Sequence, residues 1–373
     1  MTAERELAGF ALPFTAGAAL YCVFSPLFPA GTTLSAGVLL TIILSGAAVL
    51  LHPSHKRLST STIWIIIIGL ATCCGLLCRL TDDWTSICGT GAQGYIESWI
   101  NRQTEYLRNC IRSIPFNDYQ TNTLINALIT GDRSELSRDT TEIFRASGAS
   151  HILALSGMHL GIIYGLLKGI SSPMGNSPKI KTLKRAGILT ACSIYTATAG
   201  AGASLVRALI FIFIAETALS RGRFKSTGSL LLSSVIIQLT IFPDAISDIG
   251  FQLSYAAMAG IAYIYPHLQK LWPQANKNKG GISKGLRWLW STAALSISCQ
   301  LTTAPLAYIY FGTFPKYFIL TNLISSPLVL IIIPYSIIVT ALTSMGACPA
   351  ILAEYLEKLV NILIGSLSII ASL

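Results

Sequence analysis

The chain has 373 residues, of which 52% are hydrophobic and only 11% are charged, and its formal net charge at pH 7 is +10. A soluble protein of this length needs far more charge on its surface, so the composition excludes that class and indicates a chain whose solvent is mostly lipid. The positive charge does not by itself indicate nucleic-acid binding, because basic cytoplasmic loops and anionic lipid explain it equally well.

Apolar segments along the whole chain predict an all-α protein, a polytopic bundle of ten or eleven transmembrane helices. A helix that crosses about 30 Å of hydrocarbon needs roughly 20 apolar residues. Two shorter segments, 186–201 and 203–219, predict a tight hairpin, and the tail 351–373 is a weaker candidate because charged residues interrupt it. The other expected spans are, in chain order, 10–28, 33–51, 62–78, 151–168, 227–243, 250–266, 288–311 and 317–342.

Lys and Arg residues are unevenly distributed among the loops between these segments. If the N-terminus lies inside, the inner loops hold most of the chain's Lys and Arg and very few acidic residues. We expect this orientation, because cytoplasmic loops retain basic residues. It places Ser177 and Asn278 in the cytoplasm and Thr90 and Ser134 outside.

The segment that follows the first spans is the only sizeable part expected outside the membrane, and its pattern predicts amphipathic helices that lie on the membrane surface. Between Tyr95 and Arg112 apolar residues recur at helical spacing, and Trp99 suits a membrane interface. A second helix is predicted over 118–130, where Gly131 would end it. A helix packed on other spans would show the same pattern, so the pattern does not define a function.

The chain is therefore expected to have three parts: N-terminal spans at 1–80, external helices and a loop at 81–150, and the remaining spans at 151–373. Cys88 and Cys110 both lie in the external part, where an oxidising compartment would allow a disulfide between them. No C-x-x-C or paired His/Cys spacing accompanies them, so we expect no metal site.

A polar segment turns directly into an apolar helix between Leu128 and Gly165. Asp139 followed by Glu142 predicts a capping box for a short helix, and Gly148 is expected to end that helix. Polar residues then follow inside a run too apolar for a soluble surface, where such groups usually face a cavity or a neighbouring helix. These residues are His151, Ser156 and His159.

Five motifs together resemble the competence domain of the ComEC family, the channel for incoming DNA in natural transformation. Five motifs in the family's order are far more specific than any one of them. The resemblance implies a multi-pass protein of the bacterial cytoplasmic (inner) membrane. The motifs are ALITGDRSEL from Ala127, ASHILALSGMHLG from Ala149, GASLVRA from Gly202, SDIGFQLSYAAMAGI from Ser247 and TAPLAYIYFGTFPKYFILTNLISSPLV from Thr303.

The chain also departs from the family pattern. Full-length members have an external OB-like domain and a C-terminal metallo-β-lactamase-like domain beside the channel. Residues 81–94 are too few for the five strands of an OB fold, and no histidine cluster follows the last span, so both domains are expected to be missing. Ala203 stands where the family commonly has a proline before its Ser-x-x-Arg-Ala element. The sequence therefore does not decide whether a helix breaks at this position.

Arg207 is the residue most suited to meet a DNA phosphate in the membrane. Single-stranded DNA needs a polar path, because each phosphate exposed to hydrocarbon would cost many kcal/mol. A guanidinium can bind a phosphate bidentately, and an Arg inside a span costs about 2.5 to 3.5 kcal/mol. The alternative is a structural arginine paired with a carboxylate or a carbonyl, although Glu216 lies too far along the same helix and on its opposite face.

His151, Ser156 and His159 allow several interpretations. A metal shared by the two histidines of one helix fails on distance, because eight residues rise about 12 Å and ligands lie near 2 Å from the ion. An intramembrane serine protease would need a Gly-rich turn beside Ser156, which is preceded by Ala and Leu. The resemblance implies a polar seam across helices, and the structural alternative is that the histidines are merely hydrogen-bonded between packed helices.

Asp248 and Gln252 lie in a matched motif and complete the candidate residues of the DNA path. The sequence has no G-x-x-x-x-G-K-[ST] loop, so the chain cannot itself couple ATP hydrolysis to movement, and neither enzymatic activity nor a cofactor is expected. The resemblance implies single-stranded DNA, an external DNA receptor, a cytoplasmic helicase-like ATPase and membrane lipid as partners, and a homo-oligomer is compatible with it. The alternative functions are a small-solute or lipid transporter, and a reduced ComEC-like paralogue without DNA transport.

Overall fold

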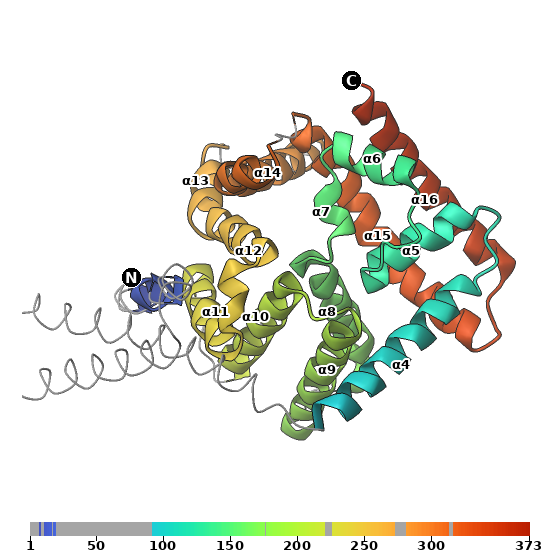
Figure 1. The fold of residues 1–373 in the computed structure, drawn as a ribbon, viewed down its shortest axis with the longest axis horizontal. Helices are drawn as coiled ribbons and strands as arrows, with labels where there is room; N and C mark the ends of the chain where they lie inside the picture. Colours follow the sequence, from blue (N-terminus) through green and yellow to red (C-terminus); the bar gives the residue numbers. More distant parts are fainter. Residues whose placement is uncertain are drawn as a thin grey trace, which may run out of the picture. The chain divides into compact units, whose positions relative to one another are not determined.

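The structure is a computed structural model that describes residues 7–8, 11–16, 18–19, 92–175, 177–220, 226–272, 281–312 and 316–373. Every regular element in these ranges is helical, which confirms the predicted all-α class (Figure 1). The chain forms two compact units. One comprises Met1–Gln93 and Ile210–Tyr255, and the other comprises Gly94–Leu209 and Ala256–Leu373.

The described part of the first unit is a short helical assembly. It contains the second half of α10 (Ala203–Ser220), then α11 (Thr227–Ile241), the 3-10 turn η3 (Pro243–Ser247) and most of α12 (Ile249–Ala259). The hydroxyl of Tyr255 donates a hydrogen bond to the side-chain oxygen of Gln238 at 3.0 Å, which joins α12 to α11. Because Gln238 is buried and paired, it acts here as a tie between helices.

The core of the second unit is built from α5 (Tyr119–Thr130), α15 (Phe318–Ser344) and α16 (Ala350–Ala371). Asp118 caps the start of α5 and Gly131, with φ of 79°, ends it, so both predicted ends are confirmed. Most residues of α5 from Thr121 to Thr130 are buried, including the polar residues Thr121, Thr123, Asn126 and Thr130. This burial differs from the expected helix on a membrane surface, because α15 and α16 pack over α5.

Glu357 ties α16 to the start of α5. The side chain is buried, and its two carboxylate oxygens accept the backbone N–H of Asp118 at 2.9 Å and the backbone N–H of Asn117 at 3.2 Å. The side-chain amide of Asn117 donates a third hydrogen bond at 3.1 Å. A buried carboxylate needs such partners, and these also satisfy donors that precede a helix.

Two further helices of the expected external segment belong to this unit. α4 (Ala92–Arg112) includes the predicted amphipathic stretch, and Trp99 on it is 44% exposed. α6 (Arg138–Ala146) is capped by Ser137, whose hydroxyl accepts the N–H of Thr140 at 3.0 Å. The predicted cap at Asp139 is therefore wrong. Ser137 and Asp139 are both good capping residues, and the chain uses the earlier one, which leaves Asp139 in the first turn beside the helix dipole.

The two shorter predicted segments correspond to α9 (Pro178–Thr198) and α10, which begins at Ala203, and their arrangement as a tight hairpin stays a prediction. Gly200 with φ of 82° and Ala201 with φ of 47° lie in the turn between the two helices, so the helix breaks there without the family's proline. The hydroxyl of Thr104 on α4 donates to the carbonyl of Thr198 at 2.8 Å and thereby closes the end of α9.

The predicted span 250–266 is not one uniform α-helix. α12 runs into a π-helical turn, η4 (Gly260–Ile264), and then into α13 (Tyr265–Lys270), while α14 (Gly281–Phe311) covers the next predicted span as a single long helix. The π turn and α13 pack against α14. The indole N–H of Trp290 on α14 donates to the carbonyl of Leu268 at 3.2 Å, close to the end of α13.

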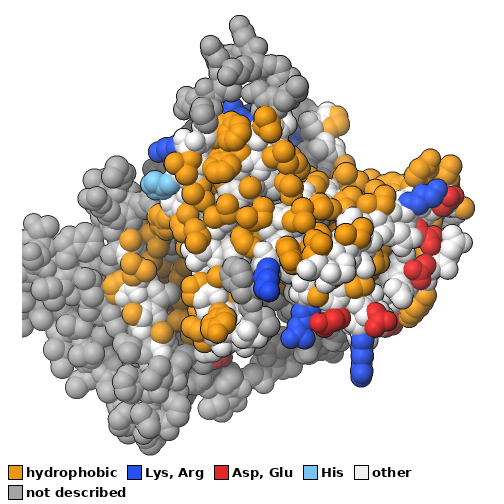
Figure 2. Space-filling model, turned by 90° about the horizontal axis from the view of Figure 1, so that it is seen from above, with side chains coloured by type: hydrophobic (Ala, Val, Ile, Leu, Met, Phe, Trp, Pro, Cys, Tyr) orange, Lys and Arg blue, Asp and Glu red, His pale blue; other side chains and the backbone are white. Residues whose placement is uncertain are grey.

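Two helices of the described ranges, α10 and α15, are long and apolar enough to cross a membrane, and α11 is apolar but shorter. Large apolar side chains on α14 to α16 are exposed, for example Ile309 at 74% and Ile369 at 67%. Figure 2 shows hydrophobic side chains over most of the described surface of one face, with few charged ones. Apolar surface of this extent suits contact with lipid.

Candidate functional site

The predicted span 151–168 is broken in the structure. α7 (Ser150–Leu153) ends after one turn, the backbone is extended from Ala154 to Ser156, and α8 (Gly157–Ser171) begins there. The sequence did not predict this break, because Ser and Gly are also common where two membrane helices pack closely. Broken helices at membrane depth place polar helix ends inside a protein.

Ser156 and His159 form the cap of α8. The hydroxyl of Ser156 accepts the N–H of Met158 at 3.3 Å, and the backbone N–H of Ser156 donates to Nδ1 of His159 at 3.3 Å. His159 therefore takes the position that Glu or Gln occupies in a capping box. The two residues that a protease would use as nucleophile and base instead hold a helix end, with 3.1 Å between the Ser156 hydroxyl and Nδ1 of His159.

Arg207 lies against the start of α8. It is one turn into α10, is only 7% exposed, and brings Nη2 to within 2.9 Å of the position that a Cβ on Gly157 would occupy. The charge of Arg207 also lies close enough to Cys299 on α14 for an electrostatic interaction. The structure thus brings Ser156, His159 and Arg207 together from two separate motifs.

His151 belongs to a second polar group, which joins α7 to α14 and α15. Its Nδ1 lies 3.2 Å from the carbonyl of Gly148, and its side chain lies beside that of Asn322. The amide of Asn322 donates to the hydroxyl of Ser296 at 3.2 Å. His151 and His159 lie near each other, so the two polar groups are neighbours in the second unit.

The loop after α5 supports the break between α7 and α8. Nε of Arg133 donates to the carbonyl of Leu153 at 3.1 Å, which closes the end of α7. A Cβ on Gly131 would lie 2.6 Å from the side chain of Leu155, so Gly131 leaves room for the extended segment. The motif that begins at Ala127 therefore packs against the end of α7 and the extended segment in the motif that begins at Ala149.

Asp132 fixes the same loop from its outer side. Its carboxylate accepts the N–H of Ser134 at 3.0 Å and lies 3.3 Å from the guanidinium of Arg108 on α4. The hydrogen bonds from Ser134, and then the charge of Arg108, hold the pKa of Asp132 below its usual value. The carboxylate consequently stays ionised at neutral pH and keeps its contact with α4.

Asp248 and Gln252 lie in the first unit and bond locally. Asp248 accepts the N–H of Phe251 at 2.8 Å, which caps α12, and the amide of Gln252 donates to the carbonyl of Ile246 at 3.0 Å. Their place in the DNA path stays a prediction. Cys110 lies on α4, and the proposed disulfide cannot be followed further because Cys88 lies outside the described residues.

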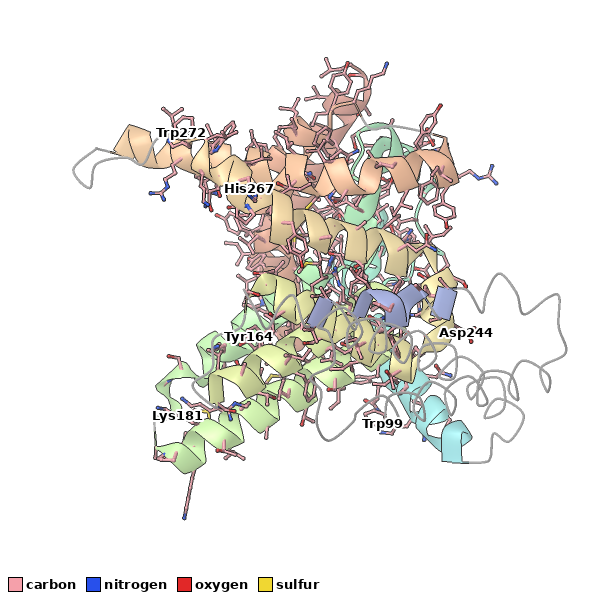
Figure 3. All side chains as sticks on the ribbon, turned by 90° about the vertical axis from the view of Figure 1, so that its left-hand side faces the viewer. Trp99, Tyr164, Lys181, Asp244, His267 and Trp272 are labelled. Carbon is pink, nitrogen blue, oxygen red and sulfur yellow. The ribbon has the colours of Figure 1, made fainter. Side chains whose placement is uncertain are left out.

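His267 does not join the polar groups around α7 and α8. Figure 3 shows His267 on α13 apart from Tyr164 on α8, and Nδ1 of His267 lies 2.7 Å from the carbonyl of Tyr263. Within the described ranges, no group of three or more His, Cys, Asp or Glu side chains could hold a metal ion. The polar side chains around α8 are instead hydroxyl, imidazole and guanidinium groups, most of which can donate hydrogen bonds.

Comparison with known proteins gives matches to competence proteins. A family model described as Competence protein matches residues 128–373. "ComE operon protein 3" of Bacillus subtilis (strain 168) is 24% identical over 216 residues, which cover 57% of this chain and 24% of that protein. "Competence protein ComA" of Neisseria gonorrhoeae is 24% identical over 247 residues, 62% of this chain and 32% of that protein. The matches thus span about a quarter to a third of these relatives, and no solved structure matches the chain.

Proposed function

The chain belongs to the competence protein family, and we propose on that basis that it is an inner-membrane channel component for the uptake of single-stranded DNA in natural transformation. One observation carries the proposal. The buried guanidinium of Arg207 lies against the amino end of the broken helix α8, so two sources of positive potential meet in an apolar environment.

The chemistry of the transported strand explains why such a group is needed. Each phosphate of DNA carries a charge whose exposure to hydrocarbon is costly, and compensating groups must therefore lie at membrane depth. Arg207 supplies a full charge with several N–H donors, and the start of α8 supplies the backbone N–H of Gly157. The polar pair of His151 and Asn322 would extend this path toward α14 and α15.

The remaining parts of the proposal follow from the family. We propose a multi-pass arrangement in the inner membrane, in which an external receptor delivers DNA and a cytoplasmic helicase-like ATPase drives movement. In this arrangement the chain itself catalyses no reaction and serves as the path. The basic segments expected in the cytoplasm, such as the start of α9 with Lys179 and Lys181, are the surfaces where the ATPase would dock.

DNA uptake by the wild-type chain tests the function directly. The chain should restore uptake of labelled DNA to transformable cells whose own channel subunit it replaces, with OB-like and nuclease modules supplied in trans. Its abundance in the membrane is quantified in the same cells. A chain that is inserted and abundant yet passes no DNA would contradict the proposal and would favour a small-solute or lipid transporter or a reduced paralogue, which broken helices also suit.

Topology is tested by single cysteines in a cysteine-free chain. Cysteines at positions 90 and 134 should react with a membrane-impermeant maleimide in intact cells, whereas those at 177 and 278 should react only after the cells are opened. The basic loops are the reason, since they favour the cytoplasm. Labelling of position 177 or 278 in intact cells would show that the orientation is reversed.

A further inference from the structure

The start of α8 is shaped to hold a guanidinium. Gly157 is the first residue of the helix, and a Cβ at that position would meet Nη2 of Arg207 at 2.9 Å and Cβ of Ala208 at 3.3 Å. Any side chain at position 157 would therefore push the guanidinium away. The small residue allows a buried cation to lie beside the positive end of a helix, an arrangement that favours a bound anion.

The first turn of α8 also keeps a backbone donor for that anion. The hydroxyl of Ser156 accepts the N–H of Met158, and the carbonyl of Ser156 accepts the N–H of His159 at 3.1 Å. No described residue accepts the N–H of Gly157. Helix N-termini with such free N–H groups are a common location for bound phosphate.

His159 gives independent evidence for a ligand. The residue is fully buried, and its Nε2 has no hydrogen-bond partner in the part of the chain that the structure describes. Because Nδ1 accepts the N–H of Ser156, the neutral ring carries its proton on Nε2, which makes that atom a donor. A buried donor without an acceptor is energetically costly, so an oxyanion that accepts this hydrogen bond would remove the cost.

We propose that the N–H of Gly157, the guanidinium of Arg207 and Nε2–H of His159 form a binding site for one phosphate oxyanion. Phosphate oxygens accept several hydrogen bonds at once, which suits donors from a backbone, an imidazole and a guanidinium. The inference rests on the proposed function only for the source of the phosphate, which is then the backbone of single-stranded DNA. The headgroup of an anionic phospholipid carries the same chemical group.

The test measures binding to the purified full chain in nanodiscs of phosphatidylcholine. The probe is a short labelled single-stranded oligonucleotide, compared with the same sequence on an uncharged methylphosphonate backbone. Gly157→Ala moves the guanidinium and keeps its charge, while Gly161→Ala on the same helix is the matched control, since no atom lies within 4 Å of the added Cβ. Gly157→Ala should weaken binding of the phosphodiester by about tenfold or more, as for the loss of a charge-assisted hydrogen bond.

The outcomes separate the site from the function. Equal affinity of the Gly157→Ala and Gly161→Ala proteins, or equal binding of the charged and uncharged oligonucleotides, would overturn the phosphate site. Competition by phosphatidylglycerol that depends on Gly157 in the same way would support the site and assign it to lipid, against the proposed function. Site-dependent binding of the oligonucleotide without uptake in cells would uphold this inference while the channel proposal fails.

Discussion

Replacing Arg207 by leucine is expected to lower DNA uptake by about 10- to 100-fold, the effect of losing 1.5–3 kcal/mol of charge-assisted hydrogen bonding to a phosphate. Arg207→Lys should keep part of the uptake, because lysine retains the charge but not the planar fork of donors. The measurement is uptake of labelled DNA in cells that rely on this chain, divided by its abundance in the membrane.

A matched control for this prediction is Arg145→Leu. Arg145 lies on α6 with its side chain 66% exposed and pairs only loosely with Glu142 at 3.7 Å, so the same substitution there should leave uptake within about twofold, as expected for a surface ion pair. A structural arginine would behave differently, because both substitutions at position 207 would then lower the amount of folded protein. Undiminished uptake by the Arg207→Leu protein would remove the DNA-path role of this residue.

Helix positions could be predicted from the sequence where apolar length or an end signal decides them. α15 begins and ends close to the predicted span 317–342, and α5 begins after Asp118 and ends before Gly131 as expected. These features depend on local chemistry: the number of apolar residues, a capping carboxylate and a glycine with positive φ. The same local logic did not decide between Ser137 and Asp139, since either residue can cap a helix.

The site could be predicted only in part. The sequence indicated which residues are polar at membrane depth, and the structure brings three of them, Ser156, His159 and Arg207, to one helix end. It could not predict the break before Gly157, because Ser-Gly also occurs within continuous membrane helices. Nor could it predict that Arg207 lies against Gly157, since that contact depends on how α10 packs on α8. Because the break before α8 lies between His151 and His159, the rise of one unbroken helix does not set the distance between these two side chains.

The break between α7 and α8 also depends on residues of the loop after α5. This dependence explains why the motif that begins at Ala127 occurs together with the motif that carries the two histidines. Arg133 closes the end of α7, and Gly131 leaves space for Leu155. Asp132 links the same loop to Arg108 on α4. The loop after α5 therefore contacts both α4 and the segment between α7 and α8.

Gly260→Ala is expected to destabilise the second unit by about 1–3 kcal/mol or more, as overpacking of a core does. A Cβ on Gly260 would clash with the backbone oxygen of Ser298 and would lie 2.7 Å from the hydroxyl of Thr302. A backbone oxygen within a helix cannot move aside, so the π turn and α14 would have to separate. Thermal unfolding in one detergent measures the effect.

Gly165→Ala on α8 provides the opposite expectation for the same chemical change. Its added Cβ would meet no atom within 4 Å, and alanine in a helix is favoured over glycine by about 0.5–1 kcal/mol. The midpoint of unfolding should therefore stay or rise for Gly165→Ala and fall for Gly260→Ala. If both variants unfold with the wild-type midpoint, the close approach of η4 to α14 is not required, because the helices can then separate at no cost.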